Sequence, residues 1–239
     1  MISVVSSGPT GKYGVVGPQF LPDAAVLDGN LTLSVPKHVT AATGIDAMVH
    51  ALEAYTSKIL KNTLSDLLAK DALRILGSNI HEAYNNGSNA EARSQMLLGS
   101  MYAGMAFCNA PVGAIHGLAY PLSCHHGMSH GESNSVTMPA VMEFNAPVAT
   151  KMYAEIAPYM FADLKEGSGT DDEITAKLVD RCKNLVPDLG IKPKLSQWGI
   201  KESDLDFLAD EGLKQQRLLP NNPRHVTKED AVDIYKNLL

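Results

Sequence analysis

The sequence of 239 residues predicts a mainly α-helical protein, in which a helical bundle follows a short β-rich segment. From residue 41 onward, apolar residues recur at intervals of three and four, as they do on the buried face of a helix. In residues 1–40, short β-prone runs alternate with turns that contain proline. The sequence therefore predicts two parts, a β-strand segment at 1–40 and an all-helical domain at 41–239.

Three short runs in the first part are predicted strands, at 2–5, 13–16 and 24–27. Pairs of residues that end in proline separate them and favour turns. Three strands of this length make an incomplete sheet, whose edges present unpaired backbone groups. We expect these edges to be covered by a partner chain, exchanged between copies, or mobile.

The second part begins with a helix predicted over residues 40–56, which contain no proline and several alanines, the strongest helix formers. Further helices are expected, in chain order, at 64–84, 91–107, 109–121, 133–144, 147–160, 171–185, 202–211 and 228–238. The Asn-Asn-Gly sequence at 85–87 should end the first of these. At the start of the last, Thr227 and Asp230 have the spacing of an N-cap pair.

Asp46 and His50 are the first candidate metal ligands. They stand four residues apart on a predicted helix, so both side chains lie on one face, one turn apart. That face adjoins the apolar stripe, where an unpaired carboxylate is costly. A metal ion would remove this cost, although such a pair, taken alone, is more often a surface hydrogen bond or a capped core histidine.

Two further segments contain a histidine immediately before a glycine. His116 lies within 109–121, whose small, uncharged residues are typical of a tightly packed helix, and a histidine buried there needs a partner. His130 follows His125 and His126 within six residues. Only one of these three need be a ligand, and nothing in the spacing requires His125 or His126 at a metal site.

Three motifs, GIDAMVHALEAY, AIHGLAYPL and SHGESN, follow one another along the chain. In sequence and spacing they resemble the iron-containing alcohol dehydrogenases, and the resemblance covers nearly the whole chain. It implies a helical domain of the dehydroquinate synthase-like or iron-containing alcohol dehydrogenase type. It also implies that Asp46, His50, His116 and His130 together hold one divalent ion, iron or zinc.

The resemblance carries further expectations about the nicotinamide cofactor, NAD(P). Lys12 matches a lysine that the family places near the cofactor, although an exposed turn lysine is the commoner interpretation. Members of the family carry a nucleotide-binding domain ahead of the helical domain, yet no glycine-rich phosphate loop precedes Asp46. We therefore expect residues 1–40 to be a remnant of that domain, and the chain to be a truncated product or fragment that is poorly active alone.

Two positions depart from the family's pattern. Tyr120 stands where many relatives have a histidine, and Ser129 stands where many have a proline. Tyr120 lies one helical turn beyond His116 and is a candidate catalytic residue that faces the substrate. Packing of a buried tyrosine against Leu52 or Tyr55 is an equal alternative.

The predicted ligand set determines the expected chemistry. Three imidazoles and one carboxylate suit Fe²⁺, Zn²⁺ or Ni²⁺, and affinity alone does not select iron. An open coordination position would lower the pKa of an alcohol or polarise a carbonyl, and hydride would pass between the substrate carbon and a nicotinamide ring. Together with the resemblance, this chemistry predicts a metal-dependent dehydrogenase that interconverts a small alcohol and its aldehyde with NAD(P).

Two other classes of function stay open. One is a polyol dehydrogenase or a dehydroquinate synthase-like metalloenzyme on a related helical domain, against which the pair of Asp46 and His50 argues. The other is a non-catalytic helical module that binds metal only structurally, or not at all. An open coordination position would separate an enzyme from such a module, because structural zinc sites are normally closed. Cys124 is an alternative ligand near His130, though ordinary packing is favoured for it.

Composition argues against several kinds of partner. The formal net charge is −6 and the basic residues are dispersed, so the chain lacks the electrostatic footprint of a nucleic-acid-binding protein. No apolar run approaches the ~20 residues that span a bilayer, and the N-terminus lacks the features of a signal peptide. The three cysteines contain no CxxC pair and argue against a disulfide framework. We expect a cytoplasmic homo-oligomer that binds neither nucleic acid nor membrane.

Overall fold

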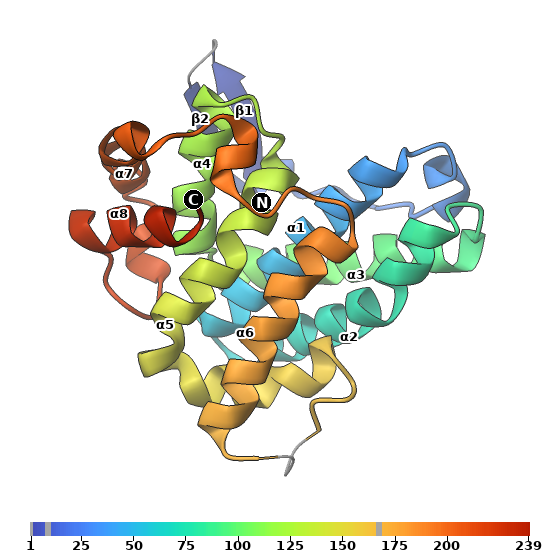
Figure 1. Ribbon diagram of the computed structural model, residues 1–239. Coiled ribbons are helices and arrows are strands. Elements are labelled where there is room, and N and C mark those ends of the chain that lie inside the picture. Colours follow the sequence, from blue (N-terminus) through green and yellow to red (C-terminus); the bar gives the residue numbers. More distant parts are fainter. Residues whose placement is uncertain (1, 8–10, 166–168) are drawn as a thin grey trace.

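The structure is a computed structural model that describes residues 2–7, 11–165 and 169–239, with the backbone alone for residues 2–7, 11–14 and 16. Within these residues the chain forms a two-stranded hairpin and a body of helices (Figure 1). The strands are β1 (Ile2–Ser7) and β2 (Gly11–Val16), and the helices are α1 (Lys37–Thr56), α2 (Thr63–Asn85), α3 (Ala90–Asn109), α4 (Ala114–His125), α5 (His130–Met160), α6 (Asp171–Asp188), α7 (Leu205–Leu213) and α8 (Lys228–Asn237). The predicted fold class, mainly α with a short N-terminal β segment, is confirmed.

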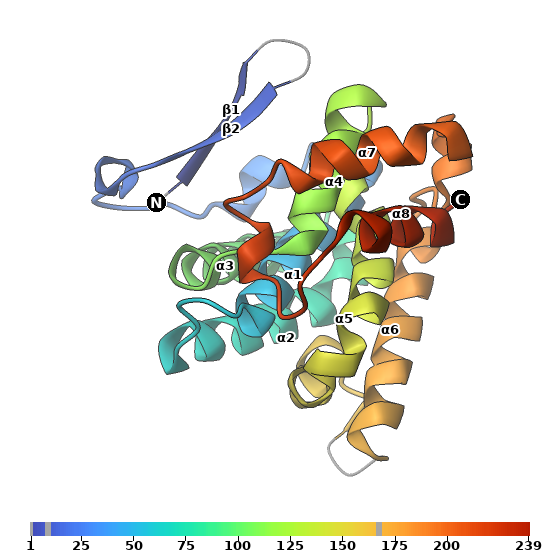
Figure 2. The same cartoon turned by 90° about the vertical axis from the view of Figure 1, so that its left-hand side faces the viewer.

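β1 and β2 pair in antiparallel fashion, with Ile2 opposite Val16, and contain the first two predicted strands. The hairpin projects away from the helical body (Figure 2). The prediction of a third strand at 24–27 is wrong, because this segment has no regular structure and the side chain of Val26 is 90% exposed. β-prone residues form a strand only beside a partner that packs and hydrogen-bonds with them, and no described strand lies there.

α5 is one helix of 31 residues where two are predicted, at 133–144 and 147–160. It contains Pro139, Pro147 and Pro158, each of which removes a backbone donor and tends to kink or break a helix. The predicted break is wrong because α5 packs along α6 on one side and against α1 and α4 on the other (Figures 1 and 2). Tertiary packing here overrides local propensity.

The remaining helices follow the predicted order, with ends that differ by a few residues. The capping box predicted from Thr227 and Asp230 is present at the start of α8. The helix predicted at 202–211 forms as a 3₁₀ turn, Glu202–Asp204, followed by α7. None of the helices that the structure describes is both long and apolar enough to cross a membrane.

α1 is the central helix of the body. α2 and α3 cover one side of it and α5 covers the other (Figure 2). Most of its residues are buried, among them Ile45, Met48 and Leu52, and a helix that is apolar around its circumference belongs inside a core. The polar side chains of α1 must therefore find their partners within the protein.

α5 approaches α1 closely at Gly131. A Cβ atom at this position would lie 2.5 Å from the carbonyl oxygen of Ala42, so only glycine permits the approach of the two backbones. The contact holds the first turn of α5, which begins at His130, beside the part of α1 that contains Asp46.

Candidate metal centre

The four predicted ligands come from three helices and meet at one point. Asp46 and His50 lie one turn apart on α1, His116 lies in the first turn of α4, and His130 is the first residue of α5. One ligand atom of each lies within 4.8 Å of those of the other three. The structure thus brings together residues that are up to 84 positions apart in the sequence, from 46 to 130.

The distances between the ligand atoms leave room for an ion. Asp46 Oδ1 lies 3.8 Å from His116 Nε2, and Asp46 Oδ2 lies 3.8 Å from His130 Nε2. Both distances exceed those of a hydrogen bond. Two ligands that each lie about 2.1 Å from a shared tetrahedral ion are themselves about 3.5 Å apart, so the observed separations fit a bound divalent ion.

Ring stacking orients the imidazole of His50. The ring lies between Phe107, at a centroid distance of 4.7 Å, and His116, also at 4.7 Å. The rings of His116 and His130 are 5.3 Å apart and tilted. Three imidazoles therefore converge with their orientations set by packing, as a preformed site requires.

Ser129 caps the helix that presents His130. Its hydroxyl accepts the N–H of Glu132 at 3.2 Å, and the Glu132 carboxylate accepts the N–H of Ser129 at 2.8 Å. This capping box starts α5 at residue 130, three residues before the predicted start. The serine that replaces the proline of many relatives therefore has a clear structural role.

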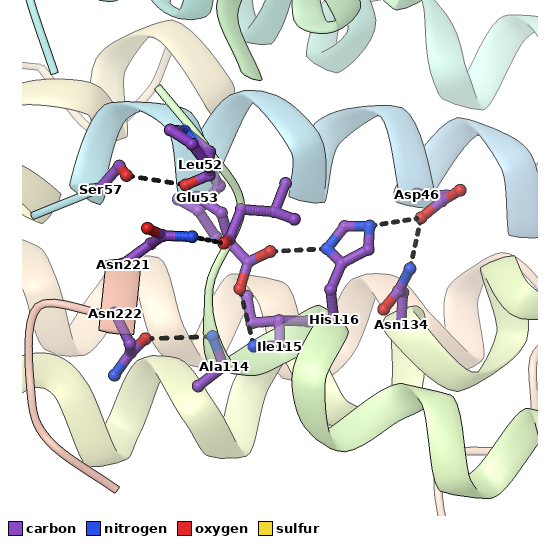
Figure 3. Close-up of polar contacts among 12 residues, drawn as sticks. Asp46, Leu52, Glu53, Ser57, Ala114, Ile115, His116, Asn134, Asn221 and Asn222 are labelled. Carbon is purple, nitrogen blue, oxygen red and sulfur yellow. Dashed lines mark hydrogen bonds and ion pairs between the residues drawn. The ribbon is translucent and has the colours of Figure 1, made fainter. Parts of the chain in front are cut away.

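Asn134 contacts two residues of the cluster and was not predicted from the sequence. Its Nδ2 group donates to Asp46 Oδ1 at 2.6 Å (Figure 3). The same group lies 3.2 Å from His130 Nε2. Asn134 follows His130 by four residues, one turn along α5, and this spacing within the SHGESN motif was the available signal. It orients the carboxylate of Asp46 within the cluster.

Glu53 is the second residue that was missed. Its carboxylate is buried, with one oxygen 2.6 Å from His116 Nδ1 and the other 2.7 Å from the backbone N–H of Ile115, which it accepts (Figure 3). Glu53 follows Asp46 by seven residues, two helical turns, so the same periodicity that pairs Asp46 with His50 also places Glu53 on their face.

The residues present fit a metal ion. Nε2 of His116 is buried and has no hydrogen-bond partner among the residues that the structure describes, while Nδ1 of the same ring is engaged by Glu53. Buried polar atoms are nearly always satisfied, so such an atom needs an explanation. A divalent cation between Nε2 and the carboxylate of Asp46 would supply one, and three imidazoles with one carboxylate suit Fe²⁺ or Zn²⁺.

The protonation of the two α1 residues also suits metal binding. Burial, more than any other cause, lowers the pKa of His50 to about 3. The ring is therefore neutral at pH 7. Burial would raise the pKa of Asp46, but the neighbouring histidines and the hydrogen bond from Asn134 lower it below its usual value. Neutral imidazole and ionised carboxylate are the forms that bind metals.

Metal affinity should rise with pH because of His116. Burial would lower the pKa of this ring, but the charge and hydrogen bond of Glu53, with the charge of Asp46, raise it above its ordinary value of 6.5. Below the raised pKa, a proton must leave before an ion binds, so Zn²⁺ affinity should fall about tenfold for each further unit of decrease in pH.

Above pH 6.5, the stability of the metal-free chain should change in the opposite direction. A raised folded-state pKa contributes stability that is complete below 6.5 and is lost as the pH rises through the raised value. Zn²⁺ titrations and urea unfolding over the same pH series check both trends, and a Zn²⁺ affinity that does not change with pH would contradict the first.

The other predicted site residues lie around or outside the cluster. Tyr120 is buried with its ring 5.7 Å from that of His130, and it packs with Val112 and Leu218 in a cluster separate from the one that contains Leu52 and Tyr55. Its proposed catalytic role stays a prediction.

Lys12 lies in β2, but its side chain is outside the described part, so its role near a cofactor also stays a prediction. His125 packs edge-on against Phe207 at 4.9 Å. Neither His125, His126 nor Cys124 belongs to the four-residue cluster.

Comparison with known proteins gives a consistent result. The model of the Fe-containing alcohol dehydrogenase family, C-terminal, matches residues 40–239. Long-chain-alcohol dehydrogenase 1 of Geobacillus thermodenitrificans (strain NG80-2) is 41% identical over 237 residues, which are 98% of this chain and 58% of that protein. The crystal structure of a 1,3-propanediol oxidoreductase matches with a TM-score of 0.90 and 33% identity, over 95% of this chain and 59% of the other. A sulfoacetaldehyde reductase from Bifidobacterium kashiwanohense was solved in complex with NAD⁺. It matches with a TM-score of 0.85 and 26% identity, over 99% of this chain and 60% of the other.

The chain spans a little over half the length of these relatives. The family match, in contrast, covers most of the chain and includes all four residues of the cluster. The chain therefore belongs to the Fe-containing alcohol dehydrogenase family, whose C-terminal part it matches.

Proposed function

We propose that this chain is the metal-binding part of a metal-dependent alcohol dehydrogenase, which interconverts an alcohol and its aldehyde by hydride transfer with NAD(P). The observation that carries the proposal is the cluster of Asp46, His50, His116 and His130, in which the buried Nε2 of His116 faces the Asp46 carboxylate at 3.8 Å. We propose these four residues as the ligands of one Fe²⁺ or Zn²⁺ ion.

The proposed centre is open on the side of His130. The side chain of His130 is 33% exposed, whereas those of Asp46 and His116 are 15% and 3% exposed. A small molecule would approach over His130, beside the ring of Tyr120, which we propose to line its path. An open side favours a catalytic over a purely structural site.

The chain's residues would hold the reacting groups in place, while the ion supplies the Lewis acidity. A bound divalent ion polarises the oxygen of an alcohol or aldehyde and stabilises the charge that develops on it. Asp46 and the three histidines would fix that ion, and Asn134 would keep the Asp46 carboxylate turned toward it. Phe107 closes the side of His50 and would keep water away from that ligand.

The relatives support a proposal for the substrate and the second cofactor. Their names give a long-chain alcohol, 1,3-propanediol and sulfoacetaldehyde, and one is solved with NAD⁺. We propose a small alcohol or aldehyde and NAD(P) for the protein to which this chain contributes, with residues 1–40 as part of the nucleotide-binding domain and 41–239 as the metal-binding domain.

A chimera tests the proposed function. The N-terminal part of the Geobacillus enzyme that this chain does not match would be joined ahead of it. We expect the chimera to oxidise alcohols with NAD(P), and the Asp46→Asn chimera to be inactive, because one anionic ligand is lost. A folded, metal-loaded chimera with no NAD(P)-linked activity on alcohols or aldehydes would contradict the proposal.

The 239-residue chain alone should bind one equivalent of divalent metal yet turn over little alcohol with NAD(P). The cluster supplies the ligands, but no glycine-rich phosphate loop precedes Asp46 to bind a pyrophosphate. Metal analysis of the purified chain, with absorbance assays of NADH and NADPH beside a full-length relative, checks both parts. Turnover equal to that of the relative would refute the second part.

A further inference from the structure

Glu53 is a buried carboxylate of α1 outside the set of four proposed ligands. Both of its oxygens contact the first turn of α4, one at His116 Nδ1 (2.6 Å) and the other at the N–H of Ile115 (2.7 Å) (Figure 3). Its side chain is 5% exposed. No step of the proposed function so far uses this group, although it lies directly behind a proposed ligand.

The contact with His116 determines which ring nitrogen carries the proton. An ionised carboxylate only accepts hydrogen bonds, so the 2.6 Å contact requires the proton on Nδ1. In the neutral ring, Nε2 then has the lone pair, and Nε2 is the atom that faces Asp46. The second bond, from Ile115, prevents the carboxylate from rotating away.

We infer that Glu53 is the positioning residue of the metal centre: it holds the proton of His116 on Nδ1 and so directs the Nε2 lone pair at the ion. This inference rests on the proposed function. Carboxylates that orient metal-bound histidines in this way raise the basicity of the ligand and fix the angle of its ring.

A separate set of contacts holds the same turn of α4 in place. Asn222 Oδ1 accepts the N–H of Ala114 at 3.4 Å and Asn221 Nδ2 donates to the carbonyl of Val112 at 2.9 Å (Figure 3 shows the first). Asn222 and Asn145 also exchange two hydrogen bonds, at 2.7 and 3.0 Å. Because these contacts do not involve Glu53, the turn should keep its position when the charge of Glu53 is removed.

The substitution Glu53→Gln tests the inference at constant side-chain size. The amide has one acceptor and one donor group. If its oxygen accepts from Ile115, its NH₂ group faces Nδ1 and favours the His116 tautomer with the proton on Nε2. We expect Co²⁺ and Zn²⁺ affinity to fall about 10- to 100-fold and the visible absorption of bound Co²⁺ to change.

Glu155→Gln is the matched control. Glu155 also accepts a hydrogen bond from an α1 side chain, the hydroxyl of Tyr55 at 2.7 Å, but it is not part of the cluster. This variant should bind Co²⁺ with the affinity and spectrum of the wild type. Circular dichroism and the thermal midpoint of the metal-free proteins show whether each variant is folded.

A measurement on the wild type covers the case in which Glu53→Gln does not fold. In the Zn²⁺-loaded chain, a ¹H–¹⁵N spectrum of the histidine rings should show His116 with its proton on Nδ1, and through-bond correlations from the ring to the backbone of His116 assign the signal. A proton on Nε2 would overturn the inference. So would a Glu53→Gln variant with wild-type affinity and spectrum, or an equal loss of affinity in Glu155→Gln.

The failure of the proposed function has a different signature. A wild-type chain that takes up no Co²⁺ or Zn²⁺, or an Asp46→Asn variant that binds them as the wild type does, would contradict the centre itself and with it the role of Glu53. If the wild type binds metal through Asp46 and only the Glu53→Gln result disagrees, the centre stands and the inference alone fails.

Discussion

The substitution His116→Ala should remove tight metal binding, whereas His125→Ala should leave it unchanged. His116 is the buried residue among the four of the proposed centre, with Asp46 3.8 Å from its Nε2 and Glu53 behind the ring. Loss of an outer partner of a metal ligand costs about 10- to 100-fold in affinity, so loss of the ligand itself should cost more than about 100-fold. His125 packs against Phe207 and lies outside the cluster.

The same substitution should destabilise the metal-free chain. Without the ring, the buried carboxylate of Glu53 keeps only the N–H of Ile115, and breaking one side of a buried charged pair costs about 3 kcal/mol. Metal content by mass spectrometry, Co²⁺ titration and urea unfolding of both variants test the two effects together. Equal metal content in folded His116→Ala and His125→Ala would show that His116 is not a ligand.

The substitution Gly131→Ala should both destabilise the chain and weaken metal binding. The added Cβ would lie 2.5 Å from the carbonyl oxygen and 2.6 Å from the carbonyl carbon of Ala42, and these are backbone atoms that cannot rotate away. α1 and α5 must separate to admit it, which moves His130 away from Asp46. Overpacking of this kind costs about 1–3 kcal/mol, and the ligands of a metal site tolerate little displacement.

Gly104→Ala is the matched control for Gly131→Ala. Gly104 lies in the interior of α3, and a Cβ there would meet no atom within 4 Å. Because alanine has the higher helix propensity, this variant should be as stable as the wild type or more stable by up to about 1 kcal/mol, with unchanged metal affinity. A Gly131→Ala chain with wild-type stability and affinity would show that the two helices can separate without cost.

The spacing of residues along the sequence predicted several local features of the structure. The four-residue interval between Asp46 and His50 predicted two side chains on one face of a helix, and α1 places them there. The pair of Thr227 and Asp230 predicted the start of α8 in the same way. Each of these features depends on residues within one or two turns, and the geometry of a helix relates such residues without any further contact.

Where the sequence analysis was wrong or incomplete, the missing information was a distant contact. The strand predicted at 24–27 has no strand beside it, and the prolines of α5 do not end it because neighbouring helices pack along its length. The hydrogen bond between Glu53 and His116 joins residues 63 positions apart, and that between Asp46 and Asn134 joins residues 88 apart. No local pattern specifies such pairs.

By itself the sequence determined the helical class and the placement of Asp46 and His50 on one helix face. Through its resemblance to a known family, it also indicated His116 and His130 as metal ligands. Only the tertiary structure decided that the four side chains meet, since this depends on the close approach of α1 and α5 at Gly131 and on the packing of α4 against α5. It also decided that Glu53 stands behind His116. The physical reason is that periodicity relates residues of one helix, whereas the distance between helices depends on the side chains and backbone atoms that fill the space between them.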